Sequence, residues 1–388
     1  MSTGAGSVDR AADDLFFGGT KRAVPPEVTF ERIQRYLAQH GITRLADITG
    51  LDCLGVPVFA AVRPRGRVLQ GSQGKGARAI DAKVSALMES LELSYAENPL
   101  HPFVQASIRE LERADREPVA PTTLPTYRAD RWSPAQRVAW IEAEDLVTGR
   151  LCMLPGSSVY YIEPSLFAIT TNGLASGNNV LEATLHALYE IYERDAASHL
   201  VDDREEITFD LCDVIDLETI QTPLVLTNID RFRKAGVELR LFRIGIESPI
   251  HTFVAVLLDD RAFAHSSQVN LGVGSHLSPM VAASRAITEA AQSRLTYIHA
   301  AREELSRASY TGGHGSLFDY FESYEADTAW SELSDASKPT MAADFETVME
   351  QLRDEGVTQI LRHTLTLPAD DIAVVKVIIP GTRDEFAY

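Results

Sequence analysis

The chain has 388 residues, of which 45% are hydrophobic and 23% are charged, and its formal net charge at pH 7 is −19. These values are typical of a globular protein with a substantial core, formed by one large domain or two smaller ones. The acidic balance argues against a nucleic-acid partner and against binding to anionic membranes, because both need clustered basic side chains. It does not argue against a phosphate ligand, since local groups and bound cations decide such a site.

Three features bear on the location of the protein. The N-terminus is small and acidic and lacks the apolar run of a signal peptide. The longest apolar runs are only as long as a strand, so no membrane span is expected. The three cysteines, Cys53, Cys152 and Cys212, lie far apart and have no metal-binding spacing. The sequence therefore predicts a cytoplasmic protein with reduced thiols.

The spacing of apolar residues, glycine and proline predicts helices and strands in alternation. A flexible arm is expected over residues 1–18, followed by a single domain over 19–388, because no long linker interrupts it. The predicted helices span residues 25–41, 81–97, 179–197, 223–236, 278–305 and 343–355. The predicted strands comprise a pair within 57–72, a hairpin within 139–157 turning at Thr148 and Gly149, a strand at 237–244, a hairpin within 251–266 turning at Asp259 and Asp260, and a last strand at 372–379.

Two segments are expected to be irregular. Residues 118–134 are rich in proline and charge and are predicted to be a surface loop, whereas 310–339 could be a functional flap or an ordinary long loop. Hairpins outnumber βαβ units among the predicted elements. The fold class is therefore predicted to be α+β, with antiparallel or mixed sheets flanked by helices.

One pattern recurs three times: a glycine-rich loop is followed by a helix with a stripe of polar side chains. The predicted loops are 71–76, 172–179 and 272–275. Because a helix turns about 100° per residue, offsets of four and seven residues fall on one face. The stripes consist of Ser85, Glu89 and Glu92; Glu182, His186, Glu190 and Glu193; and Arg285, Glu289 and Gln292. The repetition suggests internal duplication.

The stacked glutamates indicate a cation, because neighbouring carboxylates repel one another. Magnesium that bridges carboxylates and phosphates is the expected solution. A solvated helix face remains the alternative for Glu89 and Glu92, His186 could be a packing residue or a ligand, and Arg194 could pair with Glu193 or with a phosphate. Neither a GxxxxGK[ST] motif nor a GxGxxG motif after a strand occurs, which excludes a P-loop or dinucleotide-binding protein.

Three segments that carry the stripes are specific in combination: SQGKGARAIDAKVSALMESLE, TTNGLASGNNVLEATLHALYEIYERDA and HLSPMVAASRAITEAAQSR. Together they resemble the three signatures of the YcaO family, and the resemblance extends from about Gly19 to the last strand. It implies an internally pseudo-repeated YcaO-like ATP-binding fold. It also implies that ATP and Mg²⁺ bind on acidic helices and that a peptide backbone amide is activated by phosphorylation of its carbonyl oxygen.

The resemblance also implies site residues, position by position. The implied nucleotide contacts are Lys21, Ser85, Glu89, Asn178, Arg194 and Arg285, and the implied magnesium ligands are Glu89, Glu92, Glu182, Glu190 and Glu193. Glu289 and Gln292 match the third signature without an assigned role. The sequence indicates no general base, so no catalytic residue is predicted.

Two departures from the family pattern guide the choice of reaction. The first signature commonly ends in Glu-Arg, whereas Leu93 follows Glu92 here, and the proline-rich tail of many azoline-forming members is reduced to Pro380. The chain looks more like members that work with a separate TfuA protein, some of which are linked to thioamide formation. We therefore expect a peptide substrate and a TfuA-like or leader-peptide-binding partner, and we leave a homodimer open. The alternatives are an azoline-forming cyclodehydratase, a ligase that forms an acyl phosphate, and a non-catalytic nucleotide-binding scaffold.

Overall fold

The computed structural model describes residues 15–17, 19–128, 132–201, 208–260, 268–300 and 315–383. Its strands are β1 (Leu15–Phe17), β2 (Thr20–Arg22), β3 (Arg44–Asp47), β4 (Val58–Val62), β5 (Gly71–Lys75), β6 (Val104–Ala106), β7 (Val138–Asp145), β8 (Arg150–Pro155), β9 (Leu174–Gly177), β10 (Cys212–Asp216), β11 (Glu238–Ile244), β12 (His251–Leu258), β13 (Val269–His276), β14 (Thr328–Ala329), β15 (Leu361–Thr364) and β16 (Ala373–Ile378). Its α-helices are α1 (Pro26–Ile33), α2 (Ala79–Glu97), α3 (Ile108–Arg113), α4 (Val180–Ser198), α5 (Pro223–Ala235), α6 (Pro279–His299), α8 (Gly315–Glu322) and α9 (Met341–Asp354).

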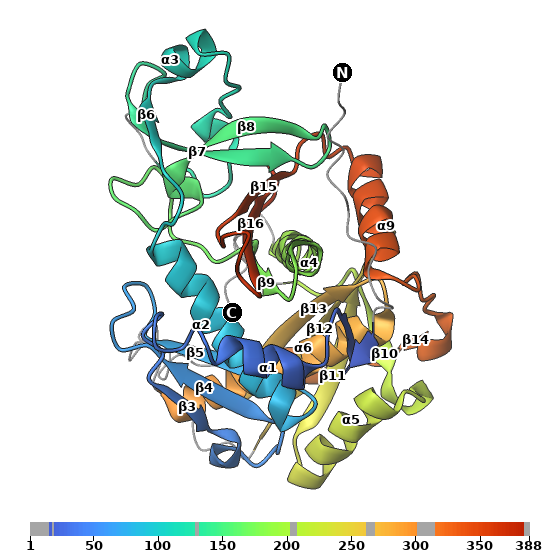
Figure 1. Ribbon diagram of the computed structural model, residues 1–388. Helices are drawn as coiled ribbons and strands as arrows, with labels where there is room; N and C mark the ends of the chain where they lie inside the picture. Colours follow the sequence, from blue (N-terminus) through green and yellow to red (C-terminus); the bar gives the residue numbers. More distant parts are fainter. Residues whose placement is uncertain are drawn as a thin grey trace.

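The described strands form two large sheets and two small ones (Figure 1). One large sheet has the order β13-β12-β11-β10-β14, and the other has the order β6-β7-β15-β16-β9, with β8 also paired to β7. The small sheets are β3-β4-β5 and β1-β2. Strand pairs are antiparallel except for β10 and β14, which are parallel. The predicted α+β class with antiparallel and mixed sheets is confirmed.

Three strand–helix units are arranged as a ring in the molecule (Figure 1). In each unit a strand is followed at once by a helix that packs back on it, as β5–α2, β9–α4 and β13–α6. Each helix also contacts the strand of another unit, because α2 meets β9, α4 meets β13 and α6 meets β5. The polar stripes are therefore brought together by a closed internal repeat.

The glycine-rich segments of these units were predicted to be loops, and that prediction is wrong for most of their residues, which form β5, β9 and part of β13. Glycine is needed there because the helix backbone lies against the strand. A Cβ atom on Gly74 would lie 2.0 Å from the backbone nitrogen of Ala86, and one on Gly272 would lie 2.1 Å from that of Ala290. The glycines thus report close strand–helix packing rather than a turn.

Most predicted elements are present with small shifts at their ends. The predicted hairpin within 139–157 exists as β7–β8, and the last predicted strand is β16. Of the hairpin predicted within 251–266, β12 is present, but its partner is β13, which begins only at Val269, and residues 261–267 lie outside the described residues. The first helix is shorter than predicted, since α1 ends at Ile33 and tighter turns follow, with the Tyr36 N–H donating to the carbonyl of Ile33. Residues 301–305 of the predicted third-stripe helix, the start of segment 310–339, residues 1–14 and 18 of the arm, and part of 118–134 lie outside the described residues.

No helix in the part of the chain that the structure describes is long and apolar enough to cross a membrane. Each helix of the ring instead belongs to a hydrophobic cluster, α2 with the six-stranded sheet, α4 with β9 and β16, and α6 with the five-stranded sheet. The apolar faces of the three helices are therefore buried against sheets.

A buried ion pair ties the end of α2 to the connection between β4 and β5. Arg63 donates two hydrogen bonds to the Glu97 carboxylate, at 2.5 and 2.8 Å. The two side chains are only 4% and 2% exposed. The backbone N–H groups of Arg67 and Val68 donate to the same carboxylate, both at 3.0 Å. The carboxylate thus satisfies four donors at once.

Replacement of Glu97 by alanine is expected to lower the free energy of unfolding by roughly 3–5 kcal/mol, because Arg63 would become an uncompensated buried charge. Urea unfolding measures this loss. Glu27→Ala serves as the control, since it breaks an ion pair with Arg78 in which both side chains are about half exposed, and exposed pairs contribute roughly 1 kcal/mol or less. Similar losses in the two variants would contradict the assignment.

His363 lies in the core of the six-stranded sheet and is neutral. Its Nδ1 lies 2.7 Å from the carbonyl oxygen of Glu142 and so carries the proton. The Tyr160 hydroxyl therefore donates to Nε2, at 2.9 Å. Burial lowers the pKa of His363 to about 4 from the usual 6.5 of histidine, even though the hydrogen bond to Glu142 opposes the shift.

This lowered pKa predicts a pH dependence of stability. Between pH 6.5 and 4 the unfolded chain binds a proton at this position that the folded chain does not, so stability falls as the pH is lowered through this window. The loss from this residue is roughly 3 kcal/mol over the whole window. Urea unfolding at a series of pH values should show a shallower dependence for His363→Gln than for the wild type. Identical slopes would exclude this contribution.

Candidate active site

The polar faces of α2 and α4 meet beside β9. Glu92 on α2 accepts a hydrogen bond from the hydroxyl of Ser176 on β9 at 2.5 Å. Burial, together with the charges of Glu190 on α4 and Glu89 on α2, holds the pKa of Glu92 well above its usual range. Carboxylates from two helices therefore share one buried region. A positive charge placed among them would favour the ionised form of Glu92.

Glu193 extends this acidic region toward β13 and α6. Its carboxylate accepts a hydrogen bond from the Ser275 N–H at 3.0 Å and lies 3.8 Å from the guanidinium of Arg285. Burial raises the pKa of Glu193 to about 8, although Arg285 opposes the shift and Glu289 adds to it. Glu193 thus connects the acidic helices with the basic third side of the ring.

The third side combines β5 and α6. The ammonium of Lys75, the last residue of β5, lies 2.5 Å from the Glu289 carboxylate on α6. Burial alone would raise the pKa of Glu289, but the charge and hydrogen bond of Lys75 oppose it. With further help from Arg194 and Arg285, the pKa of Glu289 is lowered. Three basic side chains therefore face the carboxylates of α4 and α6.

The start of α4 is tied to the N-terminal segment. Glu182 accepts hydrogen bonds from the Asn178 side chain at 3.2 Å and from the Ala23 N–H at 3.0 Å. The guanidinium of Arg22 lies 3.5 Å away. The Asn178 carbonyl oxygen in turn accepts from the Thr29 hydroxyl at 2.9 Å. Glu182, like Glu193, is thus compensated by a basic side chain and a backbone N–H.

Lys21 and Arg22 have different surroundings although they are adjacent. The Lys21 ammonium contacts the Asp344 carboxylate of α9 at 2.5 Å and also the carbonyl oxygen of Lys338. The structure therefore places Lys21 at the contact between β2 and α9, whereas Arg22 faces Glu182. A phosphate contact by Lys21 stays a prediction, and Arg22 is the neighbouring cation beside the acidic stripe.

The remaining stripe residues have separate surroundings. Ser85 is half-buried on the face of α2 that carries Glu89. Burial and the charges of Arg285 and Arg22 hold the pKa of His186 well below its usual range, so its imidazole is neutral. Its Nδ1 is buried and has no hydrogen-bond partner among the described residues. Gln292 donates to the backbone carbonyl of Gln73 on β5 at 2.9 Å, and it therefore links two units of the ring.

Three side chains at this site were not singled out from the sequence: Arg22, Lys75 and Ser176. Lys75 and Ser176 lie within the glycine-rich segments and were hidden by the interpretation of those segments as loops. Once the segments are strands, the last residues of each strand are known to lie beside the helix that follows. Predicting these segments as strands would therefore have indicated Lys75 and Ser176 as site residues.

The residues present fit magnesium by their chemistry. Carboxylate oxygens are the ligands that Mg²⁺ prefers, and the ones whose pKa is raised, Glu92 and Glu193, would gain most from a cation. Within the described ranges, no three His, Cys, Asp or Glu side chains already converge as a metal-binding group. Glu92 is engaged by Ser176 and Glu193 by the Ser275 N–H. Each contact uses one carboxylate oxygen, and a carboxylate can accept a hydrogen bond and coordinate a metal ion at the same time.

Facing acidic helices with a basic third side define a class of site that takes a cation together with a polyanion. The chain belongs to the YcaO family, since the model of that family, described as YcaO cyclodehydratase, ATP- and Mg²⁺-binding, matches residues 73–383. This confirms the family predicted from the three signatures. The prediction of ATP and Mg²⁺ agrees with the description of the family.

Relatives and a solved structure extend the match to nearly the whole chain. An uncharacterized protein of Mycobacterium tuberculosis is 35% identical over 379 residues, which cover 94% of this chain and 82% of that protein. An uncharacterized protein in the tfuA 3′ region of Rhizobium leguminosarum bv. trifolii is 33% identical over 373 residues, covering 93% and 88%. The structure of YcaO from Methanopyrus kandleri bound with AMPPCP and Mg²⁺ superposes with a TM-score of 0.76 at 23% identity, covering 96% and 95%. The fold is therefore that of YcaO proteins.

Proposed function

We propose that this protein uses ATP and Mg²⁺ to phosphorylate the carbonyl oxygen of a peptide backbone amide. The observation that carries the proposal is the ring of three strand–helix units, which sets carboxylates of α2 and α4 against a basic third side. Membership of a family described as ATP- and Mg²⁺-binding cyclodehydratases supports it. A structure of the same fold holds AMPPCP and Mg²⁺.

The proposed roles follow from charge and position. Bound magnesium would neutralise the negative charge that develops on the phosphates. Its ligands would come from Glu89, Glu92, Glu182, Glu190 and Glu193. The nucleotide contacts would be Ser85, Glu89, Asn178, Arg194 and Arg285, with Lys75 as an addition from the structure and Lys21 retained from the sequence.

The chemical need for ATP lies in the leaving group. A nucleophile adds to the amide carbonyl. The resulting oxyanion then attacks the γ-phosphoryl group of ATP, and ADP is released. Loss of phosphate then forms the product, because phosphate is a far better leaving group than the amide oxygen. When sulfide is the nucleophile, oxygen is exchanged for sulfur and the product is a thioamide.

Thioamide formation with a TfuA-like partner is the finer proposal. It is supported by the relative in the tfuA 3′ region and by one departure from the first signature, Leu93 after Glu92. Azoline formation by attack of a substrate side chain is the second candidate, because the family description names cyclodehydratases. The two reactions share the activation step and differ in the nucleophile.

Intact mass of the peptide tests the proposal and separates the two products. The protein is incubated with ATP, Mg²⁺, sulfide, a TfuA-like protein and peptides encoded near its gene. Exchange of one oxygen for sulfur indicates a thioamide, whereas loss of one water indicates an azoline. Full activity of both Glu190→Ala and Glu193→Ala in cells would instead support a non-catalytic scaffold.

A further inference from the structure

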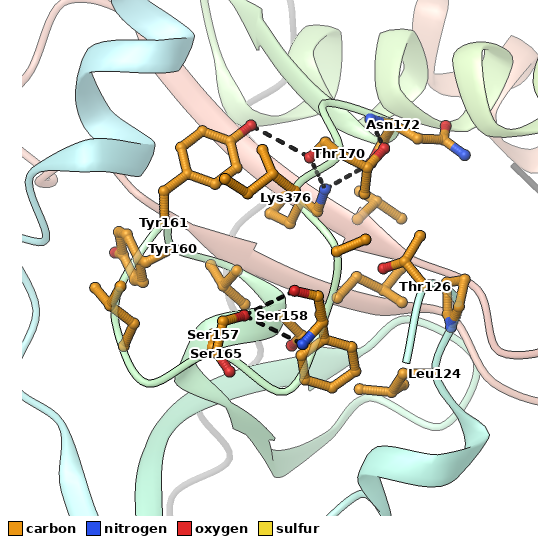
Figure 2. A pocket seen from close by; sticks show the side chains of 18 of the residues that line it. Leu124, Thr126, Ser157, Ser158, Tyr160, Tyr161, Ser165, Thr170, Asn172 and Lys376 are labelled. Carbon is orange, nitrogen blue, oxygen red and sulfur yellow. Dashed lines mark hydrogen bonds between the residues drawn. The ribbon is translucent and has the colours of Figure 1, made fainter. Parts of the chain in front are cut away.

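A cavity of 230 Å³ lies between β16, the segment 157–170 and the segment 124–126 (Figure 2). Apolar side chains form most of its walls, among them Phe167 and Ile378. Its volume is below the roughly 300–1,000 Å³ that is usual for pockets of drug-sized ligands. The cavity is therefore suited to a group about as large as one amino-acid residue, and it is separate from the stripes of α2, α4 and α6.

One end of the cavity is polar and held in place by hydrogen bonds (Figure 2). The ammonium of Lys376, a residue only 4% exposed, donates to the backbone carbonyls of Asn172 at 2.7 Å and Thr170 at 3.3 Å. The hydroxyl of Tyr161 donates to the same Thr170 carbonyl at 3.2 Å. Lys376 and Tyr161 thus fix the backbone over residues 170–172, which borders the cavity.

This polar end lies next to the acidic region of the candidate active site. Lys376 on β16 is paired with Leu174 on β9. Ser176, two residues farther along β9, has its side chain on the same face of the sheet and donates to Glu92. Two residues of a strand span roughly 6.6 Å. The cavity and Glu92 are therefore neighbours on one face of the six-stranded sheet.

A second connection runs through α4 and Tyr161. Ile191 of α4 lines the cavity and directly follows Glu190 in the chain. Burial raises the pKa of the Tyr161 phenol, and the charges of Glu190 and Glu92 add to the shift. The phenol therefore lies within electrostatic range of both carboxylates. Two independent observations, one on β9 and one on α4, therefore place the cavity near the acidic region that contains Glu92 and Glu190.

We propose that this cavity receives an apolar residue of the substrate peptide and so holds a neighbouring backbone amide beside Glu92 and Glu190. The proposal rests on the proposed function, because it assumes a peptide substrate. The volume fits one residue, and the mostly apolar walls favour an apolar side chain, with Arg67, Glu163 and Lys376 as the charged lining residues. The nearby carboxylates are where the amide would be activated. The cavity thus sets a preference for the residue next to the modified amide.

Fluorine NMR tests the cavity with a defined probe, the peptide N-acetyl-glycyl-para-fluorophenylalanyl-glycinamide, added to the full-length protein with Mg²⁺ and AMPPCP. The probe is expected to bind saturably, and the tripeptide with leucine in the central position should compete whereas the one with aspartate should not. Ala168→Phe, which fills the cavity, should weaken binding roughly tenfold or more, since burial of an apolar side chain is lost.

A matched pair of surface variants controls for general effects. Ile169 lines the cavity and is 61% exposed, while Leu151 on β8 is 60% exposed and does not line it. Ile169→Asp should weaken probe binding, and Leu151→Asp should leave it unchanged. Calorimetry with Mg²⁺ and AMPPCP should give the same affinity for Ala168→Phe as for the wild type, which shows that the variant is folded.

Two results would overturn the proposal: a probe that fails to bind the wild type, or one that binds Ala168→Phe with unchanged affinity. Failure of the proposed function is a separate result. If the probe binds in the cavity but no peptide is modified in the presence of ATP and Mg²⁺, the pocket is retained and the amide-activating function is rejected.

Discussion

Glu92→Gln is expected to abolish Mg²⁺-dependent ATP turnover and, at the same time, to raise the melting temperature of the nucleotide-free protein. Glutamine keeps the shape of glutamate and can still accept the hydrogen bond from Ser176. It removes a half-buried carboxyl whose pKa is raised by desolvation and by the charges of Glu190 and Glu89. Because the carboxylate is a proposed magnesium ligand, turnover should fall by about a hundredfold or more.

Two measurements separate these effects. Phosphate release at saturating ATP and Mg²⁺ reports turnover, and thermal unfolding in the presence of EDTA reports stability without the metal. Mg²⁺ with AMPPCP should raise the melting temperature of the wild type, since a ligand that binds only the folded state stabilises it, and should raise that of Glu92→Gln much less. Glu112→Gln, at an exposed position of α3, is the control and should match the wild type in both. A variant that is both active and less stable would contradict the assignment.

The stripes could be predicted from the sequence because helical periodicity depends only on local spacing. Glu89, Glu92, Glu190 and Glu193 were expected on single faces, and the structure places them on α2 and α4 around one buried region. The signatures also led to the right family. These features share one property, which is that they are encoded within a single helix and its preceding residues.

Contacts between units could not be predicted in the same way. The pairing of Lys75 with Glu289 joins β5 to α6, which are more than two hundred positions apart, and no local pattern reports it. No local pattern predicts the hydrogen bond between Ser176 and Glu92 or the ion pair between Lys21 and Asp344 either. The ring closes only when α6 returns to β5. The wrong prediction of loops at the glycine-rich segments has a related cause. Glycine is required there by contact with a helix backbone, and that contact cannot be seen in the local sequence.

Gly74→Ala is expected to destabilise the protein severely, whereas Gly71→Ala in the same strand should be nearly neutral. A Cβ on Gly74 would lie 2.0 Å from the Ala86 nitrogen and 2.4 Å from the Ala82 carbonyl oxygen, so β5 and α2 would have to move apart. Backbone atoms cannot rotate away as a side chain can, and we expect a loss of about 3 kcal/mol or more in urea unfolding. Apart from its own chain neighbours, no described residue has a heavy atom within 4 Å of a Cβ on Gly71.

The consequence of Gly74→Ala should reach the active site, because β5 ends in Lys75 and α2 carries Glu89 and Glu92. A displacement of α2 from β5 separates the Lys75–Glu289 pair from the carboxylates that it faces. We therefore expect any folded Gly74→Ala protein to bind Mg²⁺ and AMPPCP more weakly in calorimetry, with Gly71→Ala unchanged. Equal stability and affinity in the two variants would contradict the claim that Gly74 is required for the close contact between β5 and α2.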